Sequence, residues 1–371
     1  MSLLNKAIKA ILKRLPLGNY ILFESRPDYG DNSKSVYDEM LARGMNKKYK
    51  IVWICDDSPV KQKDSIAVFV GRNTKLATFY GIRAKVLVCS NRFLEPVSDK
   101  QFSFFLAHGT AVKKVNGFYH LPESIRYCLA ASPNTVSLRA EEFCVPEERV
   151  VPLGFPRNDL LSLPKKNLQS YFHKRYKKIV LWLPTYRQEI SGGKTGSQIT
   201  IPLLWDDKNA ELIDDYCKKN SILIVIKPHF AQDMSFIKGT KYYNITYIDD
   251  QFFADNGISL YSVLGSFDAL LTDYSSVYFD YTLCDKPIGL IWEDYEEYKH
   301  NPGFAVDMDY YMKGGVKIYS TKELLSFFAE IINGVDSHIN ERREIRDFVN
   351  ISCDGMNSKR VVDFIIQKAN L

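Results

Sequence analysis

The chain has 371 residues, of which 46% are hydrophobic and 25% are charged. These values are ordinary for globular proteins, so they argue against intrinsic disorder and allow one or two domains with large cores. The formal net charge of +5 is mild; it fits an anionic substrate or a membrane surface, and we expect no nucleic-acid partner. The seven cysteines are scattered without a CxxC pair, and no apolar stretch approaches the length of a membrane span. A disulfide framework, a zinc site and a transmembrane helix are therefore not expected.

The segment 1–18 has a pattern of its own. Its apolar residues recur at helical spacing, its lysines lie largely off that stripe, and Pro16 and Gly18 end the predicted helix. The lysines interrupt the apolar run, which argues against a secretory signal. A basic amphipathic helix of this kind lies in the interface of an anionic leaflet, so we predict a membrane-surface helix at 1–18. The alternative is a terminal helix that packs on the protein's own core.

From residue 19 onward, apolar strand-like runs alternate with helix-like segments. In the first half, strands are predicted at 20–25, 49–56, 66–71 and 84–90, helices at 35–44 and 76–83, and an apolar run at 102–110. In the second half, strands are predicted at 177–187, 221–230, 246–250, 267–276 and 286–294, and a helix at 358–369. Apolar strands separated by helices are typical of parallel sheets built from βαβ units.

A stretch rich in proline and glycine, 151–166, separates the two halves and is predicted to be the linker. It divides the chain into the helix at 1–18, an N-terminal lobe at 19–155, a C-terminal lobe at 156–345 and a closing helix at 346–371. We predict an α/β fold with two Rossmann-like, doubly wound lobes facing a central cleft. Ligands of such sheets bind beyond the carboxyl ends of the strands, where the candidate residues of this chain also lie.

The first candidate is His108, which follows the apolar run in FFLAHGT. A histidine at a strand end is exposed to the crevice and has the right chemistry to deprotonate an attacking hydroxyl. Gly109 and Thr110 form the turn beside it, and the glycine permits close approach of a ligand. The alternative is a buried histidine that is hydrogen-bonded to its own turn.

The second candidate is the Lys227-Pro228-His229 segment after the apolar run SILIVI. The proline stiffens the turn that presents the histidine, and a lysine and a histidine at one strand end are typical of a phosphate clamp. The alternative is a solvated Lys227 and a His229 that caps a helix.

A third group consists of hydroxyl-bearing and basic residues after two other predicted strands. Thr272-Asp273-Tyr274-Ser275-Ser276 stands where a strand ends and a helix begins, which favours an anion site, although Asp and Ser are also ordinary N-caps. Arg187 ends the segment 177–187, a predicted strand that runs into a loop, and could bind a diphosphate from just past the strand end. The loop at 190–198 lacks the phosphate-loop pattern, which disfavours a nucleoside triphosphatase.

Asp307 and Asp309 form a weak DxD pattern that is better explained as a solvated pair, so no metal site is predicted.

Taken together, these motifs resemble the CDP-glycerol glycerophosphotransferase family of teichoic acid and capsule synthesis. The matching segments are AHGT at 107–110, WLPTYR at 182–187, IKPH at 226–229 and LTDYSSVYFDY at 271–281. ESRPDYGDNSKSVYDEM at 24–40, LGFPRND at 153–159 and CDGMNSKRVVDFI at 353–365 also look like family segments, in consistent order. Two departures are Ala111 and Phe230, which stand where the family often has proline.

The resemblance implies a GT-B architecture with the donor mostly on the C-terminal lobe. It also implies attack by an acceptor hydroxyl on the glycerol-bearing phosphorus of CDP-glycerol, with release of CMP. By the motif match, His108 would be the general base, and His229 would stabilise the donor phosphates or the leaving group. No metal and no cofactor are expected, so protein groups would offset the charge that develops. The donor-binding residues would be Thr185, Arg187, Lys227, Thr272, Asp273, Ser275 and Ser276.

The partners expected for such an enzyme are a CDP-polyol donor, a lipid-linked glycan acceptor and an anionic membrane surface, at the cytoplasmic face of a bacterial cell membrane. Three alternatives stay open from the sequence. The donor could be CDP-ribitol, the chain could be a GT-B glycosyltransferase that uses a nucleotide-sugar, or it could be a non-catalytic, membrane-associated binding protein.

Overall fold

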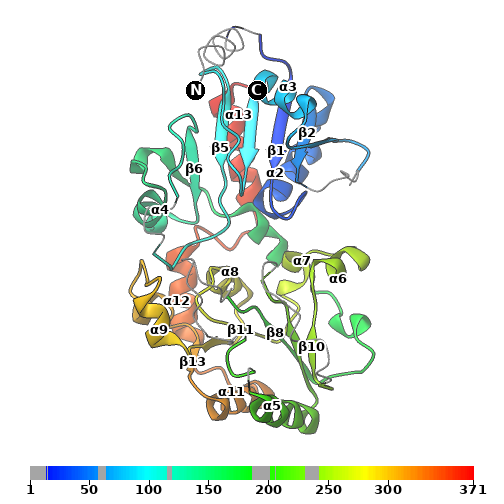
Figure 1. The fold of residues 1–371 in the computed structure, drawn as a ribbon, viewed down its shortest axis with the longest axis vertical. Helices are drawn as coiled ribbons and strands as arrows, with labels where there is room; N and C mark the ends of the chain where they lie inside the picture. The colour runs from blue at the N-terminus through cyan, green and yellow to red at the C-terminus, as the bar shows by residue number, and fades with distance from the viewer. Residues whose placement is uncertain are drawn as a thin grey trace. The chain divides into compact units, whose positions relative to one another are not determined.

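The structure is a computed structural model that describes residues 14, 16–56, 64–114, 119–185, 201–204, 206–229 and 242–371. The chain forms two compact units (Figure 1). The first comprises Met1–Thr110, Val115–Ser162 and Val349–Leu371, and the second comprises Ala111–Lys114 and Leu163–Phe348. The main crossing thus lies at Ser162 and not at the predicted 155–156, and the closing segment returns to the first unit. The predicted helix at 1–18 falls almost wholly outside the described residues.

The first unit is built on a seven-stranded, wholly parallel sheet in the order β3-β2-β1-β4-β5-β6-β7. The order reverses between β1 and β4, which is the switch point where doubly wound sheets bind ligands. The strands are nearly all apolar because helices cover both faces of such a sheet. They are β1 (Tyr20–Glu24), β2 (Lys50–Cys55), β3 (Val68–Gly71), β4 (Val86–Cys89), β5 (Phe102–Phe105), β6 (Tyr127–Ala130) and β7 (Val150–Pro152).

Within the described residues, four α-helices accompany this sheet: α2 (Asp31–Ala42), α3 (Lys75–Arg83), α4 (Val136–Phe143) and α13 (Asn357–Ala369). Short 3-10 turns lie at Met45–Lys47, Pro133–Thr135, Glu147–Arg149 and Pro156–Ser162. The C-terminal α13 packs beside α2, and its Val361, Val362 and Ile365 are buried. This burial explains why the closing segment joins the first unit although it follows the second in the chain.

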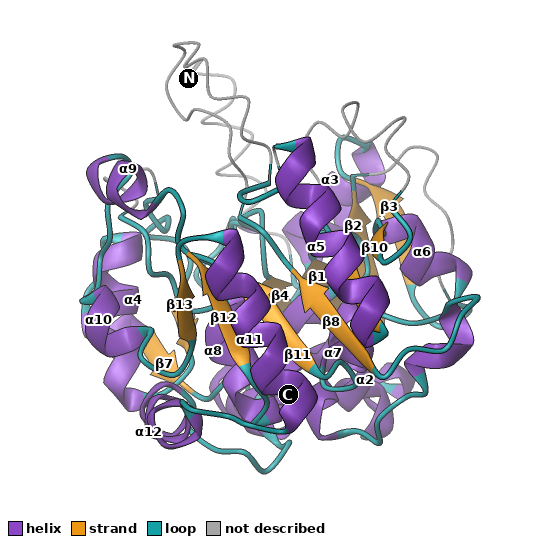
Figure 2. Ribbon diagram, turned by 90° about the horizontal axis from the view of Figure 1, so that it is seen from below, coloured by secondary structure: helices purple, strands orange, loops and turns teal. Residues whose placement is uncertain are grey.

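The second unit has a six-stranded parallel sheet in the order β10-β9-β8-β11-β12-β13, with its switch point between β8 and β11. Helices α5 and α11 lie together over one face, where an apolar core joins them to the strands (Figure 2). The strands are β8 (Lys178–Trp182), β9 (Ile222–Ile226), β10 (Ile245–Tyr247), β11 (Ala269–Thr272), β12 (Ile288–Ile291) and β13 (Val316–Ile318).

The helices of the second unit range from one turn to nearly four turns. They are α5 (Asp207–Asn220), α6 (Asp250–Asp255), α7 (Leu260–Leu264), α8 (Val277–Tyr281), α9 (Tyr295–His300), α10 (Met308–Tyr311), α11 (Thr321–Asn333) and α12 (Ile339–Val349), with 3-10 turns at Leu168–Tyr171 and Thr282–Cys284. In the described part of the chain, no helix has the length and hydropathy that crossing a bilayer requires. The predicted α/β class with two doubly wound lobes is confirmed.

Candidate functional site

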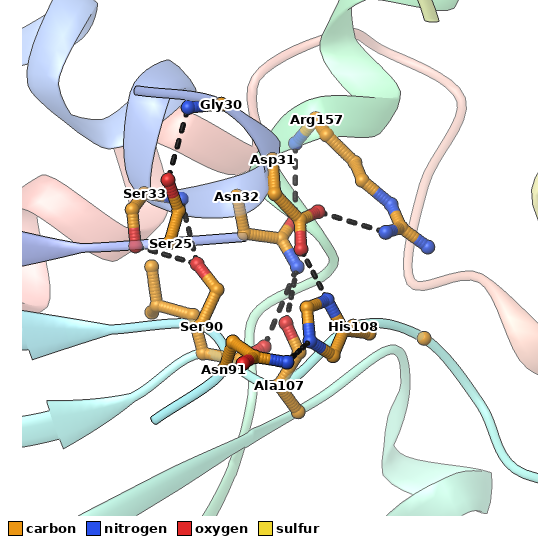
Figure 3. Close-up of polar contacts among 12 residues, drawn as sticks. Ser25, Gly30, Asp31, Asn32, Ser33, Ser90, Asn91, Ala107, His108 and Arg157 are labelled. Atoms are coloured by element: carbon orange, nitrogen blue, oxygen red, sulfur yellow. Dashed lines mark hydrogen bonds and ion pairs between the residues drawn. The ribbon is translucent and has the colours of Figure 1, made fainter. Parts of the chain in front are cut away.

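His108 stands at the carboxyl edge of the first sheet, just beyond β5. Its side chain is 43% exposed, and both ring nitrogens have partners (Figure 3). Nδ1 contacts the carboxylate of Asp31, and Nε2 lies 2.7 Å from Nδ2 of Asn91. The preceding Ala107 has a φ of 52°, a left-handed conformation that costs an L-residue about 1–2 kcal/mol. The turn that presents His108 is therefore held by its surroundings and is not a relaxed turn.

Asp31 fixes the orientation of the imidazole. It lies in the first turn of α2, its side chain is only 5% exposed, and it also pairs with Arg157 at 2.8 Å. Burial would raise the pKa of Asp31, but Arg157 and His108 outweigh it and hold that pKa below its usual value. An ionised carboxylate can only accept hydrogen bonds, so Nδ1 of His108 carries the proton. In the tautomer with the proton on Nδ1, the lone pair of Nε2 faces the Asn91 amide.

The first turn of α2 joins three neighbouring strand ends (Figure 3). Nδ2 of Asn32 donates to the Ala107 carbonyl at 2.8 Å, while its Oδ1 accepts the backbone N–H of Arg157 at 3.1 Å. The Ser33 hydroxyl donates to the Glu24 carbonyl at 2.7 Å, and the Ser33 N–H donates to the Ser90 hydroxyl at 3.1 Å. These bonds tie the ends of β1, β4 and β5 together at the switch point. The His108 side chain is thus attached to a polar network whose other members are largely buried.

Glu24 holds the loop that carries Asn91. This residue is fully buried at the end of β1, and its carboxylate accepts the backbone N–H groups of Asn91 and Arg92 at 3.0–3.1 Å. The guanidinium of Arg72 also pairs with this carboxylate, with Nη2 of Arg72 at 3.1 Å from Oε1 of Glu24. Burial raises the pKa of Glu24 by more than these N–H groups and Arg72 lower it. Glu24 therefore fixes the backbone of Asn91 and leaves its side chain facing His108.

The two turn residues after His108 are also inside the protein. Gly109 is buried and its carbonyl accepts a hydrogen bond from the guanidinium of Arg139, which also pairs with Glu142. Thr110 is 3% exposed. These two residues anchor the turn. His108, which precedes them, keeps its side chain partly exposed at the sheet edge.

The second unit gathers its predicted donor residues at the ends of three adjacent strands, β9, β8 and β11. The carboxylate of Asp273 accepts the Thr185 N–H at 2.9 Å, the Thr185 hydroxyl at 2.5 Å and the Tyr274 N–H at 2.7 Å. The Thr272 hydroxyl donates to the Leu183 carbonyl at 2.9 Å. Thr185, Thr272 and Asp273 are buried. Asp273 and Thr272 therefore brace the two strand ends at the switch point.

The other predicted donor residues differ in their surroundings. Ser275 and Ser276 are partly exposed where α8 begins, and His229 is exposed after β9. Lys227 pairs with Asp250 at 3.0 Å. Arg187 lies outside the described residues.

Both carboxylates of the DxD pattern, Asp307 and Asp309, make contacts with other groups of the protein. The carboxylate of Asp307 caps the N-terminus of α10, and that of Asp309 pairs with Lys317. No group of three or more His, Cys, Asp or Glu side chains suited to a metal ion occurs within the described ranges.

The sequence prediction assigned no role to Asp31, Asn91 or Arg157. Two of them stand in segments that carried the family resemblance, since Asp31 belongs to ESRPDYGDN and Arg157 to LGFPRND. The motifs therefore contained these two residues, but nothing in the sequence indicated that Asp31 contacts His108 or that Arg157 contacts Asp31. Asn91 stands two residues after β4 and has no motif of its own.

The chain is similar to several known proteins along most of its length. A family model described as CDP-Glycerol:Poly(glycerophosphate) glycerophosphotransferase matches residues 8–367. A teichoic acid glycerol-phosphate transferase of Staphylococcus aureus is 25% identical, over 96% of this chain and 95% of that protein. A teichoic acid ribitol-phosphate primase of Bacillus spizizenii is 27% identical, over 64% of this chain and 58% of that protein. Among solved structures, the wall teichoic acid polymerase TagF soaked with CDPG has a TM-score of 0.71 at 21% identity, over 95% of this chain and 89% of that chain.

Proposed function

Because this chain belongs to the CDP-glycerol:poly(glycerophosphate) glycerophosphotransferase family, we propose that it transfers glycerol phosphate from CDP-glycerol to a hydroxyl of a lipid-linked wall or capsule glycan and releases CMP. The observation that carries the proposal is the Asp31–His108 pair at the carboxyl edge of the first sheet. A histidine whose Nδ1 is held by a buried carboxylate offers Nε2 as a general base to a hydroxyl.

In the proposed step, the acceptor hydroxyl takes the place of the Asn91 amide at Nε2 of His108. Its oxygen attacks the glycerol-bearing phosphorus of CDP-glycerol, and its proton passes to Nε2. A new phosphorus–oxygen bond forms, and the bond from that phosphorus to the bridging oxygen breaks. CMP leaves with the bridging oxygen and its electron pair. The imidazolium that results is stabilised by the carboxylate of Asp31, which Arg157 keeps in place.

The donor is proposed to bind at the carboxyl edge of the second sheet. His229, Ser275 and Ser276 are the exposed or partly exposed groups there, and Lys227 can leave the exposed Asp250 carboxylate to meet a phosphate. Thr185, Thr272 and Asp273 would hold the strand ends beneath them, and Arg187 is the remaining diphosphate ligand in the proposal. Protein cations and hydroxyls would offset the charge on the leaving group without a metal or cofactor.

Glycerol phosphate is the first choice of transferred group because the family model and the Staphylococcus aureus relative both name it. Ribitol phosphate is the second, because the Bacillus spizizenii relative is a ribitol-phosphate primase. A lipid-linked acceptor would place the enzyme at the cytoplasmic face of a bacterial membrane.

The test is nucleotide release from CDP-glycerol, CDP-ribitol and a UDP-sugar, each with a lipid-linked glycan acceptor. We expect CMP from CDP-glycerol, unchanged by a chelator, and a loss of about 10²–10⁴-fold in His108→Ala, the usual contribution of a general base. His120→Ala, which changes an exposed histidine of the same unit, is the matched control. Release of UDP would make the chain a glycosyltransferase, and turnover with CDP-ribitol alone would reassign the donor. Full turnover in His108→Ala would refute the assigned base, and no turnover in the wild type would favour a binding protein.

A further inference from the structure

The turn that leads into α2 holds Asp31 in an unfavourable backbone conformation. Tyr29 and Asp31 have φ values of 60° and 56°, in the left-handed region that residues with a Cβ atom rarely adopt. Contacts with other parts of the unit therefore have to hold the turn. One such contact is at Gly30, whose N–H donates to the hydroxyl of the buried Ser25 at 2.9 Å (Figure 3). The direction of the Asp31 carboxylate depends on these contacts, because Asp31 is itself one of the strained residues.

A second contact ties the turn to Asp64, which lies just ahead of β3. The Tyr29 hydroxyl donates to Oδ2 of Asp64, and the hydroxyl of Tyr37, on α2, donates to the same oxygen at 2.5 Å. Oδ1 of Asp64 accepts the N–H groups of Ile66 and Ala67, both at 2.8 Å. The carboxylate is thus oriented by its own turn, and its other oxygen is a fixed point to which the two tyrosine hydroxyls are attached.

The three side chains of this cluster keep their protonation states at neutral pH. Burial would raise the pKa of Asp64, but the two tyrosine hydroxyls and the two N–H groups outweigh it and hold that pKa below its usual value. Burial and the Asp64 carboxylate raise the pKa of Tyr29 and of Tyr37. The acceptor therefore stays ionised and both donors stay protonated, so the attachment is permanent and does not act as a pH switch.

The ring of Tyr29 packs independently of its hydroxyl. It meets the rings of Trp53, in β2, and Phe69, in β3, edge-to-face at centroid distances of 5.1 and 5.4 Å. Nζ of Lys34 lies 4.7 Å from the centroid of the Tyr29 ring. A phenylalanine at this position would keep these contacts and lose only the hydroxyl. The role of the hydroxyl can therefore be tested separately from that of the ring.

We propose that Asp64 and Tyr29 are positioning residues for His108, the proposed general base. Their hydrogen bond holds the left-handed turn, and the turn aims the Asp31 carboxylate at Nδ1 of His108. Tyr37 shares the same oxygen of Asp64 but is fully buried within α2, whose own backbone hydrogen bonds hold it in place. Loss of the Tyr29 hydroxyl therefore disturbs His108, whereas loss of the Tyr37 hydroxyl does not. The effect on rate rests on the proposed function, and the effect on the imidazole of His108 does not.

The experiment compares Tyr29→Phe with Tyr37→Phe in the full chain, because each removes one hydroxyl from the same oxygen of Asp64. We expect both variants to lower the Tm by about 2–4 °C. Only Tyr29→Phe should lower kcat for CMP release, by about tenfold, because a misaligned base loses much of its contribution. Tyr37→Phe should stay within about threefold of the wild-type kcat.

A second measurement does not need turnover. The ¹⁵N resonances of the His108 imidazole, assigned with His108→Ala and recorded at about pH 8, show which ring nitrogen carries the proton. We expect the proton on Nδ1 in the wild type and in Tyr37→Phe. In Tyr29→Phe we expect a mixture of the two tautomers, because the Asp31 carboxylate no longer fixes the proton on Nδ1.

A second pair of variants changes the carboxylate itself. Asp64→Ala removes the acceptor, and we expect a mixture of tautomers and a fall in kcat of about 10²-fold. Asp64→Asn keeps one oxygen for the two N–H groups and turns its NH₂ group toward the two tyrosine hydroxyls, which can also accept hydrogen bonds. We therefore expect Asp64→Asn to keep the proton of His108 on Nδ1 and to stay within about fivefold of the wild-type kcat.

A change of tautomer in Tyr29→Phe and Asp64→Ala that is absent from Tyr37→Phe and Asp64→Asn would support the positioning role. Equal tautomer populations in Tyr29→Phe and Tyr37→Phe would overturn it, because the two hydroxyls would then only stabilise the fold. The tautomer decides the matter even where the wild type releases no CMP or His108→Ala keeps full turnover, and those two results count against the proposed function instead.

Discussion

Replacing Asp31 with asparagine tests the proposed base most directly. The carboxylate meets two donors at once, Nη1 of Arg157 on Oδ1 and Nδ1 of His108 on Oδ2. An amide of the same shape has only one oxygen, so one of the two donors would face an NH₂ group. The substitution therefore removes one buried, charge-assisted hydrogen bond while leaving the volume of the site nearly unchanged.

The side-chain amide of the Asp31→Asn variant can be oriented in two ways, and both impair His108 as a general base. If its NH₂ group faces Arg157, a buried charged hydrogen bond is lost, at a cost of about 3 kcal/mol or about 10²-fold in rate if the loss falls on the transition state. If the NH₂ group faces His108, Nδ1 must accept, the proton moves to Nε2, and the lone pair that would take the acceptor proton is gone. The general-base contribution of up to about 10⁴-fold would then be lost.

We therefore expect kcat of Asp31→Asn to fall by about 10²–10⁴-fold, with KM for CDP-glycerol changed by less than about threefold, because the donor is proposed to bind on the other unit. The assay is steady-state CMP release at saturating acceptor, with thermal unfolding measured in parallel to establish that the variant is folded. Asp38→Asn is the matched control, since Asp38 is on the same helix, is 53% exposed and forms an ion pair with Lys34. A folded Asp31→Asn that keeps more than about a tenth of the wild-type kcat would refute the reasoning.

Two further predictions concern the second unit. Asp273→Asn is expected to lower the free energy of unfolding by about 3 kcal/mol, because a buried carboxylate that accepts from the N–H and hydroxyl of Thr185 becomes an amide that turns a donor toward one of them. Urea unfolding measures this free energy, and Asp309→Asn, which changes an exposed carboxylate, is the control. A decrease of less than about 1 kcal/mol in Asp273→Asn would contradict the role of Asp273 in bracing the strand ends. Lys227→Gln is expected to raise KM for CDP-glycerol about tenfold, whereas Asp250→Asn, which frees the lysine, should leave it unchanged or lower it. Initial rates of CMP release distinguish them, and an unaltered KM in Lys227→Gln would remove that residue from the donor site.

The sequence predicted the central strands of both sheets because each is a short, nearly continuous apolar run bounded by polar residues. Strands β6, β7 and β13 were not predicted. Two of these, β7 and β13, are edge strands of three residues with mixed burial; β10 shares these features and was predicted at 246–250, so a short edge strand is detected only in some sequences. β7 also ends within the stretch 151–166, which is rich in proline and was predicted to be the linker.

The site was predicted in part for a related reason. His108 could be recognised because it directly follows an apolar strand, and strand ends of doubly wound sheets meet ligands. Asp31 stands 77 residues away from His108, and an acid in the first turn of a helix is common for its own sake. Arg157 is 126 residues from Asp31 and lies in the stretch that was predicted to be the linker. Which acid and which arginine complete the site depends on the order of strands in the sheet, which brings β1, β4 and β5 together.

The net charge of the chain takes on a different meaning once the ion pairs are known. A charge of +5 fits an anionic substrate and an anionic membrane equally well when only composition is considered. In the first unit, however, the arginines at the edge that carries His108 are paired with buried or partly buried acids. Within the described residues of that unit, α3 and the amino edge carry cations without acidic partners. The positive charge at the edge that carries His108 is therefore largely neutralised within the protein, and we expect the acceptor to be recognised there by hydrogen bonding more than by charge.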